Sequence, residues 1–148
     1  LYGALSEPTP YRRFCAAIDG YVDFALENPR LYEVIFVPPT VWGEGVLPEE
    51  LEAQACAIEN FFEDRVRECV ATGVLRDDRV GPTLWAHTHG MLTLYRRGHL
   101  EDHGIADADA CRAMIRESTT RILEGLGGEA MRAETGRTEP EGDSGAAA

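Results

Sequence analysis

The sequence has no lysine, no closely paired cysteines and no hydrophobic run long enough to cross a membrane. A membrane-spanning helix needs about 20 consecutive apolar residues, and no stretch here approaches that length. The beginning of the chain shows no basic segment followed by an apolar one, so no secretory signal is visible. These absences predict a cytoplasmic protein with no membrane partner.

The four cysteines, Cys15, Cys56, Cys69 and Cys111, are spread along the chain without the Cys-x-x-Cys spacing that is typical of zinc sites. Disulfide-stabilised scaffolds are shorter and much denser in cysteine. We therefore interpret all four as reduced thiols that pack as small apolar side chains. No cofactor is expected from them.

Positive charge is scarce. The chain has 14 arginines against 26 aspartates and glutamates, which gives a formal net charge of −12 at pH 7. A surface this acidic repels the phosphate backbone of nucleic acids and the headgroups of anionic lipids. The 148 residues are otherwise those of one ordinary globular domain, 44% hydrophobic and 27% charged. This stretch alone is therefore not expected to bind DNA or a membrane surface.

Common catalytic motifs are also missing. The chain has no Gly-x-Ser-x-Gly, no phosphate-binding loop and no Gly-x-Gly-x-x-Gly. Neighbouring carboxylates do occur, at Glu49 and Glu50 and at Asp77 and Asp78. Each pair lies near an expected helix start, where the helix dipole and capping favour acidic side chains. An enzyme is therefore the weaker class of function.

The sequence does carry strong helical periodicity. From Pro10 onward, apolar residues recur at i, i+3, i+4 and i+7, with Thr9 as N-cap and with Asn28 and Pro29 as the end of the helix. No alternation typical of strands is present. The sequence predicts an all-α bundle of about five helices. After the first helix we expect one or two helical turns within 31–36 and a long helix from Pro48 to Gly73. A fourth helix is expected from Gly81 and Pro82 to Gly98, and a last one, capped by Asp107 or Asp109, runs to Leu126.

Two segments differ in composition from the helices. Residues 37–47 hold two prolines and two glycines, which predicts a loop with Trp42 as its only large side chain. After Gly127 the chain contains one large apolar residue, Met131, among acidic and small ones. Residues 128–148 are therefore predicted to form a disordered acidic tail.

Four histidines, His87, His89, His99 and His103, lie within one quarter of the chain. On a helix, residues two apart point to nearly opposite sides, so His87 and His89 cannot bind one ion together. His99 and His103 have a spacing of four, but glycines bracket them and favour a loop. A small all-α metal-binding protein or enzyme that uses the His87–His103 region is the alternative function.

Aromatic residues are concentrated in the first four expected helices and the loop between them. Most are expected to form the core. Some could instead line an apolar pocket in which a few polar groups orient a ligand. The candidate ligand-binding residues are Tyr21, Phe24, Phe36, Trp42, Phe61, Phe62, Arg65, Trp85, Thr88 and His89.

Four passages together resemble the C-terminal domains of tetracycline-repressor (TetR) family regulators. Trp85 followed by His89 and Gly90 resembles the Trp-His-Gly motif of one type of these domains. The passage YVDFALENPRLYEVIF, residues 21–36, resembles the family pattern Y-x-x-F-A-x-x-x-P-x-x-Y/F-x-x-x-F. GVLRDD at 73–78 and ILEGL at 122–126 are similar to the link into the Trp-His-Gly helix and to the end of the last helix.

The resemblance covers about residues 10–127 and implies the effector-sensing and homodimerisation domain of a bacterial transcriptional regulator, whether repressor or activator. The family's N-terminal helix-turn-helix would precede this chain, residues 1–9 would end the linker from it, and DNA would be bound only there. A small, mostly apolar effector would control DNA binding allosterically. The last two helices would form a four-helix dimer interface through Met91, Leu94, Tyr95, Ala110, Met114, Ser118 and Ile122.

Overall fold

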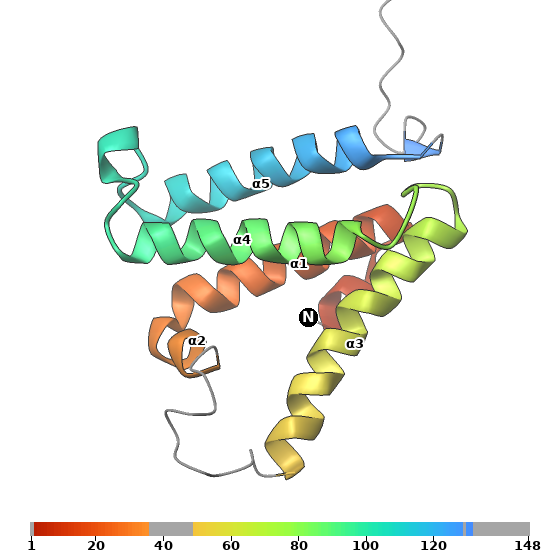
Figure 1. The fold of residues 1–148 in the computed structure, drawn as a ribbon, viewed down its shortest axis with the longest axis horizontal. Coiled ribbons are helices and arrows are strands. Elements are labelled where there is room, and N and C mark those ends of the chain that lie inside the picture. The colour runs from red at the N-terminus through yellow and green to blue at the C-terminus, as the bar shows by residue number, and fades with distance from the viewer. Residues whose placement is uncertain (1, 36–48, 129, 132–148) are drawn as a thin grey trace, which may run out of the picture.

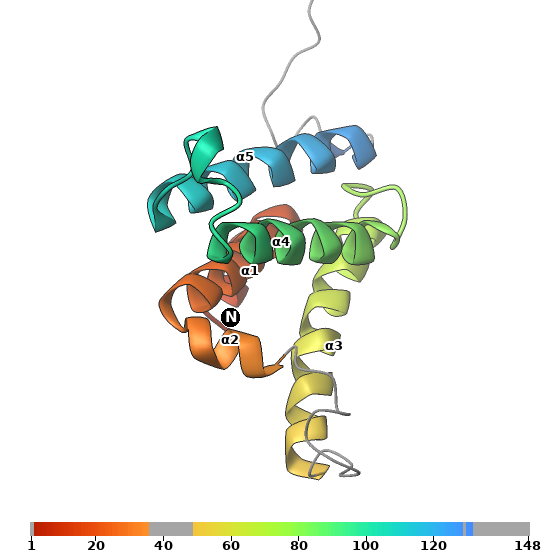
Figure 2. The same cartoon turned by 60° about the vertical axis from the view of Figure 1, so that its left-hand side comes forward.

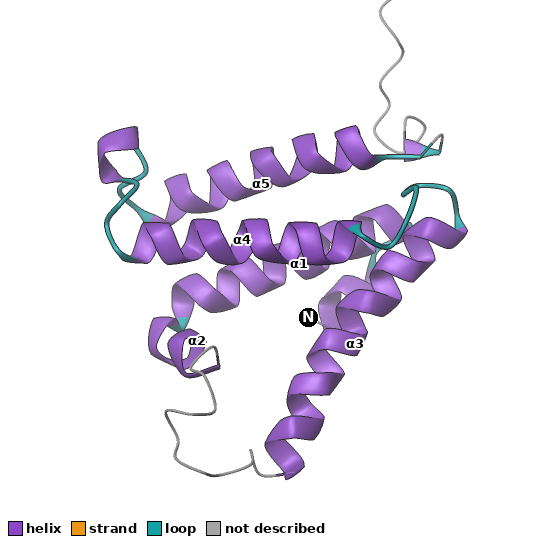
Figure 3. Cartoon of the chain, viewed as in Figure 1, coloured by secondary structure: helices purple, strands orange, loops and turns teal. Residues whose placement is uncertain are grey.

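The computed structural model describes residues 2–35, 49–128, 130 and 131, and these form a bundle of helices (Figures 1 and 3). The described residues contain no strand, and their one β-bridge joins Leu75 to Gly127. The predicted all-α class with five helices is confirmed. The elements are the 3-10 turn η1 (Tyr2–Ser6), α1 (Pro10–Glu27), α2 (Pro29–Ile35), α3 (Glu49–Ala71), α4 (Val80–Arg96), the 3-10 turn η3 (Glu101–His103) and α5 (Ala108–Leu126).

The predicted caps of α1 and α5 are present. The Thr9 hydroxyl accepts a hydrogen bond from the backbone N–H of Arg12, and Pro10 occupies the first turn, where its missing N–H costs nothing. Of the two capping candidates for α5, Asp107 is the one that caps, since its carboxylate accepts from the N–H of Ala110 at 2.8 Å. Local sequence thus sets where both helices begin.

The observed bounds differ from the predicted ones at α2 and α4. Pro29 begins α2 directly after the end of α1 at Glu27, so only Asn28 separates them. Helix α4 begins at Val80, with Pro82 inside its first turn rather than at its start. Proline is tolerated there because the first N–H groups of a helix have no intrahelical partner. Gly73 ends the turn after α3 with φ of +73°, as its position predicted.

The helices pack around one apolar core. Helices α4 and α5 lie side by side, α1 crosses behind α4, and α3 leans away so that its N-terminal half projects beyond the others in both views (Figures 1 and 2). The core residues with the least exposed surface include Val22, Cys69, Leu75, Leu92, Cys111, Ile115 and Leu123. Each of the five α-helices contributes at least one core residue with under a tenth of its surface exposed, and the residue from α2 is Tyr32.

The cysteines are placed as the sequence analysis expected where they can be seen. Cys69 and Cys111 are buried, Cys15 is partly buried, and all three are reduced. Burial raises the pKa of the Cys15 thiol to about 11, so it stays protonated at neutral pH. The side chain of Cys56 lies outside the described residues.

The packed structure continues past the end of α5, into the segment predicted to be a tail from residue 128. The N–H of Gly128 donates to the carbonyl of Val74 at 2.8 Å, and that of Ala130 donates to the carbonyl of Gly73 at 3.2 Å. Met131 is only 3% exposed. The reason is that Met131, the one large apolar residue of the segment, packs in the core against distant parts of the chain. Residues 132–148, also assigned to the tail, lie outside the described residues.

Gly128 is required for this contact. A Cβ at position 128 would lie 2.1 Å from the carbonyl oxygen of Gly73, which no side chain can tolerate. The end of α5 is therefore joined to the turn that follows α3. Among the described helices, none is long and apolar enough to cross a membrane.

Candidate functional site

Five side chains from four helices form an aromatic cluster, which we define as Tyr21 of α1, Tyr32 of α2, Phe62 of α3, and Trp85 and His89 of α4. Tyr21 meets Phe62 edge-on, with ring centroids 6.0 Å apart, and meets Tyr32 at 5.8 Å. Trp85 stacks on His89 at 5.9 Å. Trp85 and His89 can stack because residues four apart share one face of a helix. The cluster therefore joins α1, α2, α3 and α4 at one point.

A chain of hydrogen bonds runs through the cluster. The hydroxyls of Tyr21 and Tyr32 lie 3.0 Å apart, and the Tyr32 hydroxyl lies 2.7 Å from Nδ1 of His89. Burial raises the pKa of both tyrosines, and a hydrogen bond from Trp85 to Tyr21 only partly opposes this, so both phenols keep their protons. We assign Tyr21 as donor to Tyr32, and Tyr32 as donor to His89.

The same network fixes the state of His89. Burial lowers the pKa of His89 below its ordinary value of 6.5, so the ring is neutral at pH 7. With Nδ1 accepting from Tyr32, the remaining proton sits on Nε2. The site thus presents flat aromatic faces together with a neutral, oriented imidazole, which suits a ligand that is mostly apolar and carries a hydrogen-bonding group.

The structure brings some of the predicted ligand-binding residues together and not others. Tyr21, Phe62, Trp85 and His89 lie in the cluster itself. Phe61 packs against Phe62 at 6.0 Å, and the Arg65 guanidinium lies 5.0 Å from the centroid of Phe61 while pairing with Glu68 at 2.8 Å. Thr88 is buried in the core, and Phe24 packs against the core residues, so neither side chain is part of the aromatic cluster. Phe36 and Trp42 lie outside the described residues.

Tyr32 is the residue that the site prediction missed. It is 3% exposed and links Tyr21 to His89 through its hydroxyl. Its place in the passage at 21–36 was visible in the sequence, but a buried tyrosine in a core and one in a site have the same pattern. The Arg96 guanidinium also lies 5.8 Å from the centroid of the Tyr32 ring.

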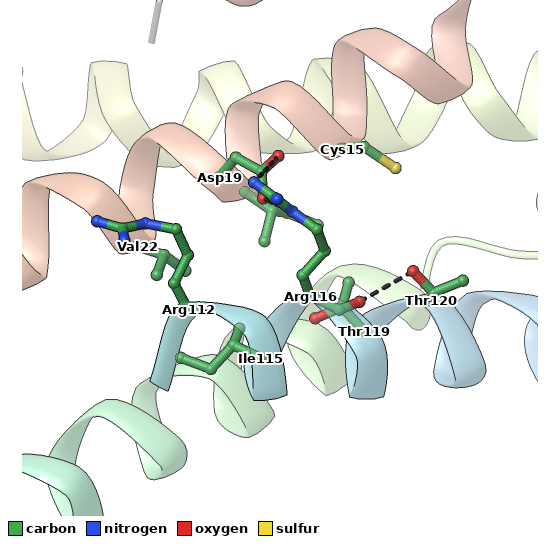
Figure 4. Close-up of a pocket in the computed structure, with 9 residues that line it drawn as sticks. Cys15, Asp19, Val22, Arg112, Ile115, Arg116, Thr119 and Thr120 are labelled. Carbon is green, nitrogen blue, oxygen red and sulfur yellow. Dashed lines mark hydrogen bonds and ion pairs between the residues drawn. The ribbon is translucent and has the colours of Figure 1, made fainter. Parts of the chain in front are cut away.

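Trp85 is not enclosed by the rest of the described structure, as the wall of a closed pocket would be. More than half of its side chain, 55%, is exposed in the described structure. An apolar surface of this size beside a polar network is a natural contact for a ligand. Two hollows in the described part of the chain lie elsewhere, one between α1 and α5 (Figure 4) and the other beside the connection from α4 to η3.

His87 points away from the cluster, as its spacing from His89 predicted. Its Nε2 lies 2.7 Å from the hydroxyl of Ser118 on α5, and that hydroxyl also donates to the carbonyl of Met114. Burial lowers the pKa of His87, which keeps it neutral at pH 7. Across the described ranges, no group of three or more histidines, cysteines, aspartates or glutamates is placed to hold a metal ion.

An apolar face runs along α4 and α5 near the His87–Ser118 hydrogen bond; we define this α4–α5 face by Leu94, Met114 and Gly90. Leu94 is 42% exposed and Met114 is 37% exposed. Gly90, between His87 and Leu94 on the same side of α4, has no described atom within 4 Å of where a Cβ would be. The other expected interface residues, Met91, Tyr95, Ala110 and Ile122, are partly buried against their own core.

The neutral state of His89 predicts a dependence of stability on pH. Because its pKa in the folded state lies below 6.5, the unfolded chain binds the proton more tightly, and stability falls as pH drops through 6.5 and below. We expect the melting temperature of His89→Gln to fall less than that of the unmodified protein between about pH 7.5 and about pH 5. His87 has a lowered pKa of the same sign, so part of the dependence remains.

The matched control is His99→Gln, since His99 is exposed in the connection after α4. This substitution removes a histidine that takes no part in the hydrogen bonds between Tyr21, Tyr32 and His89, so it shows what the loss of a histidine outside the cluster does. An equal acid-induced loss of stability in His89→Gln and the unmodified protein would contradict the neutral, hydrogen-bonded assignment of His89.

Five helices, with an aromatic cluster between the first four and an apolar face on the last two, make up this all-α bundle. Residues 14–118 match the family model described as tetracyclin repressor-like, C-terminal domain. The match spans well over half of the chain, so this chain belongs to the TetR-like C-terminal domain family. No curated protein and no solved structure matches it significantly.

Proposed function

We propose that this domain senses a small, mostly apolar effector and forms a homodimer, and that it thereby controls DNA binding by a helix-turn-helix in a longer transcriptional regulator. The observation that carries the proposal is the aromatic cluster, in which hydrogen bonds join Tyr21, Tyr32 and His89 beside an exposed Trp85. The family of regulatory domains to which the chain belongs supports the same function.

The cluster supports ligand sensing because a molecule bound there would contact several helices at once. Stacking on Trp85 and hydrogen bonding to the His89 network would orient an aromatic or cyclic ligand. Such a ligand favours whichever arrangement of α1, α3 and α4 it fits best. It can shift the conformational equilibrium only by the difference between its affinities for the two arrangements.

The α4–α5 face supports homodimerisation. A monomer gains nothing from Gly90 in the middle of a helix, where glycine is about 1 kcal/mol less favourable than alanine, and no described neighbour requires its small size. A helix from a second subunit could approach closely at this point. Leu94 and Met114 would then be buried in the interface instead of facing water.

Control of DNA binding would pass through α1. This helix carries Tyr21 of the cluster, and its beginning follows η1 near the start of the chain. A change in the position of α1 relative to the dimer helices would alter the spacing of two DNA-reading heads. Effector and operator DNA would then weaken each other's binding reciprocally, by a coupling free energy of about 1–3 kcal/mol.

Native mass spectrometry of the purified domain at micromolar concentration tests this function. We expect a metal-free dimer, and any co-purified adduct of a few hundred daltons would begin the search for the effector. The spectrum separates dimerisation, bound metal and bound small molecule in one measurement. A monomer carrying stoichiometric zinc would overturn the proposal and favour the histidine-based alternative.

A further inference from the structure

His87 and Ser118 form a hydrogen bond on the α4–α5 face, the surface to which we assigned homodimerisation. Nε2 of His87 lies 2.7 Å from the hydroxyl of Ser118. On α4, His87 precedes Gly90 by about one turn and Leu94 by about two turns. On α5, Ser118 follows Met114 by about one turn. A polar contact thus lies among the residues that define the face.

The hydrogen bonds around Ser118 determine where the proton of neutral His87 lies. The Ser118 hydroxyl has a single hydrogen, which it donates to the carbonyls of Met114 at 2.8 Å and Ile115 at 3.1 Å. It therefore accepts from His87, and we assign the proton to Nε2. Nδ1 has no hydrogen-bond partner among the described residues and is not sealed from solvent. A second proton would bind at Nδ1, without breaking the bond to Ser118.

Helix α4 offers His87 no charge to pair with. It contains no aspartate, glutamate, lysine or arginine from residue 81 to residue 95. The other histidine of the helix, His89, is directed toward Tyr32 instead. Burial lowers the pKa of His87, and no neighbouring charge raises or lowers it further. The face is therefore uncharged around His87 at neutral pH.

The charged side chains of α5 near this level are engaged elsewhere. They form ion pairs with α1 or within α5 itself: Arg112 with Asp23 and Asp109, Arg116 with Asp19, and Arg121 with Glu117. The side chains of Arg112 and Arg116 extend toward α1 (Figure 4). Glu117 and Arg121 lie beside Ser118 in sequence but are mostly exposed. None of these carboxylates is positioned to neutralise a charge on His87.

Association through the α4–α5 face would remove the remaining water from His87. A neutral imidazole can be buried there, because Ser118 already accepts its N–H. An imidazolium would be buried beside Leu94 and Met114 without a carboxylate partner, and burial of an unpaired charge is strongly unfavourable. The monomer therefore binds the second proton more tightly than the dimer does. By linkage, protons then favour the monomer.

We propose that His87 makes homodimerisation sensitive to pH, so that the α4–α5 face associates while His87 is neutral and separates when mild acid protonates it. The inference rests on the proposed homodimer and adds the control of its assembly by protons. Its sign is opposite to that of the overall charge. Each chain carries a formal charge of −12, so partial neutralisation by acid would by itself reduce repulsion and strengthen association.

Sedimentation velocity measures the dissociation constant of the dimer in neutral and in acidic buffer. Each subunit takes up a proton as the dimer separates, so the constant should rise by about tenfold or more between about pH 7.5 and about pH 5. His87→Gln keeps a neutral side chain with an N–H donor and should remove most of this dependence. His87→Lys is charged in both buffers and should weaken the dimer already at neutral pH.

His99→Gln is the matched control, because it removes an exposed histidine in the connection after α4. His89→Gln removes the histidine of the aromatic cluster, on another side of α4. Both variants should keep the pH dependence of association that the unmodified domain shows. Circular dichroism in each buffer confirms that the subunits compared are folded.

Failure of this inference and failure of the proposed homodimer give different results. A domain that is monomeric even at neutral pH and micromolar concentration would overturn both. A dimer whose dissociation constant changes equally with pH in His87→Gln and in the unmodified domain would leave homodimerisation standing and exclude His87 as the sensor. A His87→Lys dimer as tight as the unmodified one at neutral pH would exclude it as well.

Discussion

Replacing Leu94 and Met114 together by glutamate should convert the proposed homodimer into a monomer. Both side chains are exposed on the α4–α5 face, and a twofold interface would bring four new carboxylates together in an apolar contact. Like charges brought together in an interface cost several kcal/mol, so the dissociation constant should rise by about 1000-fold. Native mass spectrometry and analytical ultracentrifugation at micromolar concentration measure the change.

The same substitutions should leave the fold of each subunit intact, because neither side chain belongs to the buried core. Leu31→Glu is the matched control. Leu31 is 58% exposed on α2, away from the α4–α5 face, and should not affect association. A dimer that persists in Leu94→Glu with Met114→Glu would place the interface elsewhere and remove the main physical support for homodimerisation through α4 and α5.

The second large effect is expected at the aromatic cluster. Trp85→Ala and Phe62→Ala should each weaken effector binding by about 10- to 100-fold, since each removes a large apolar contact of about 1.5–3 kcal/mol. Trp85 is mostly exposed, so its removal should cost little stability, whereas Phe62 packs against the core. Titration calorimetry with the tightest binder from a panel of small apolar compounds measures the loss.

Arg67→Ala provides the control for these two variants. Arg67 lies on α3, as Phe62 does, but it is exposed, and its ion pairs among the described residues are with Glu63 and Asp64 of the same helix. Affinity should stay within twofold of the unmodified domain, because exposed ion pairs of this kind contribute little. Unchanged affinity in both Trp85→Ala and Phe62→Ala would show that the effector binds outside the cluster.

Local features of the fold could be predicted because they depend on neighbours along the chain. Thr9, Pro10 and Asp107 act within one helical turn, so their capping roles follow from residue type and position. The opposite directions of His87 and His89 follow from helix geometry alone, and the structure places them on Ser118 and Tyr32 respectively. The five helices and their class were predictable for the same reason.

Features that depend on contacts between distant segments could not be predicted. The role of Tyr32 requires Tyr21 and His89 to meet, and these residues lie on different helices. From the sequence alone Met131 belongs to a polar tail, and its burial depends on the contact of its segment with the turn after α3. The sequence identifies the aromatic and polar residues, but which of them contact one another depends on how the helices pack.

Helix α3 is fastened at its C-terminal end to the segment after α5. The N–H groups of Gly128 and Ala130 donate to the carbonyls of Val74 and Gly73, which directly follow α3, while the N-terminal half of α3 projects beyond α1 and α4 (Figure 1). The helix is about 35 Å long, and Phe62 lies about 14 Å from the fastened end. A tilt that moves Phe62 by about 1 Å therefore moves the far end by about 2.5 Å. A tilt of α3 about its C-terminal end would therefore displace its N-terminal end more than it displaces the aromatic cluster, and the pivot would lie where the chain after α5 closes back onto the bundle.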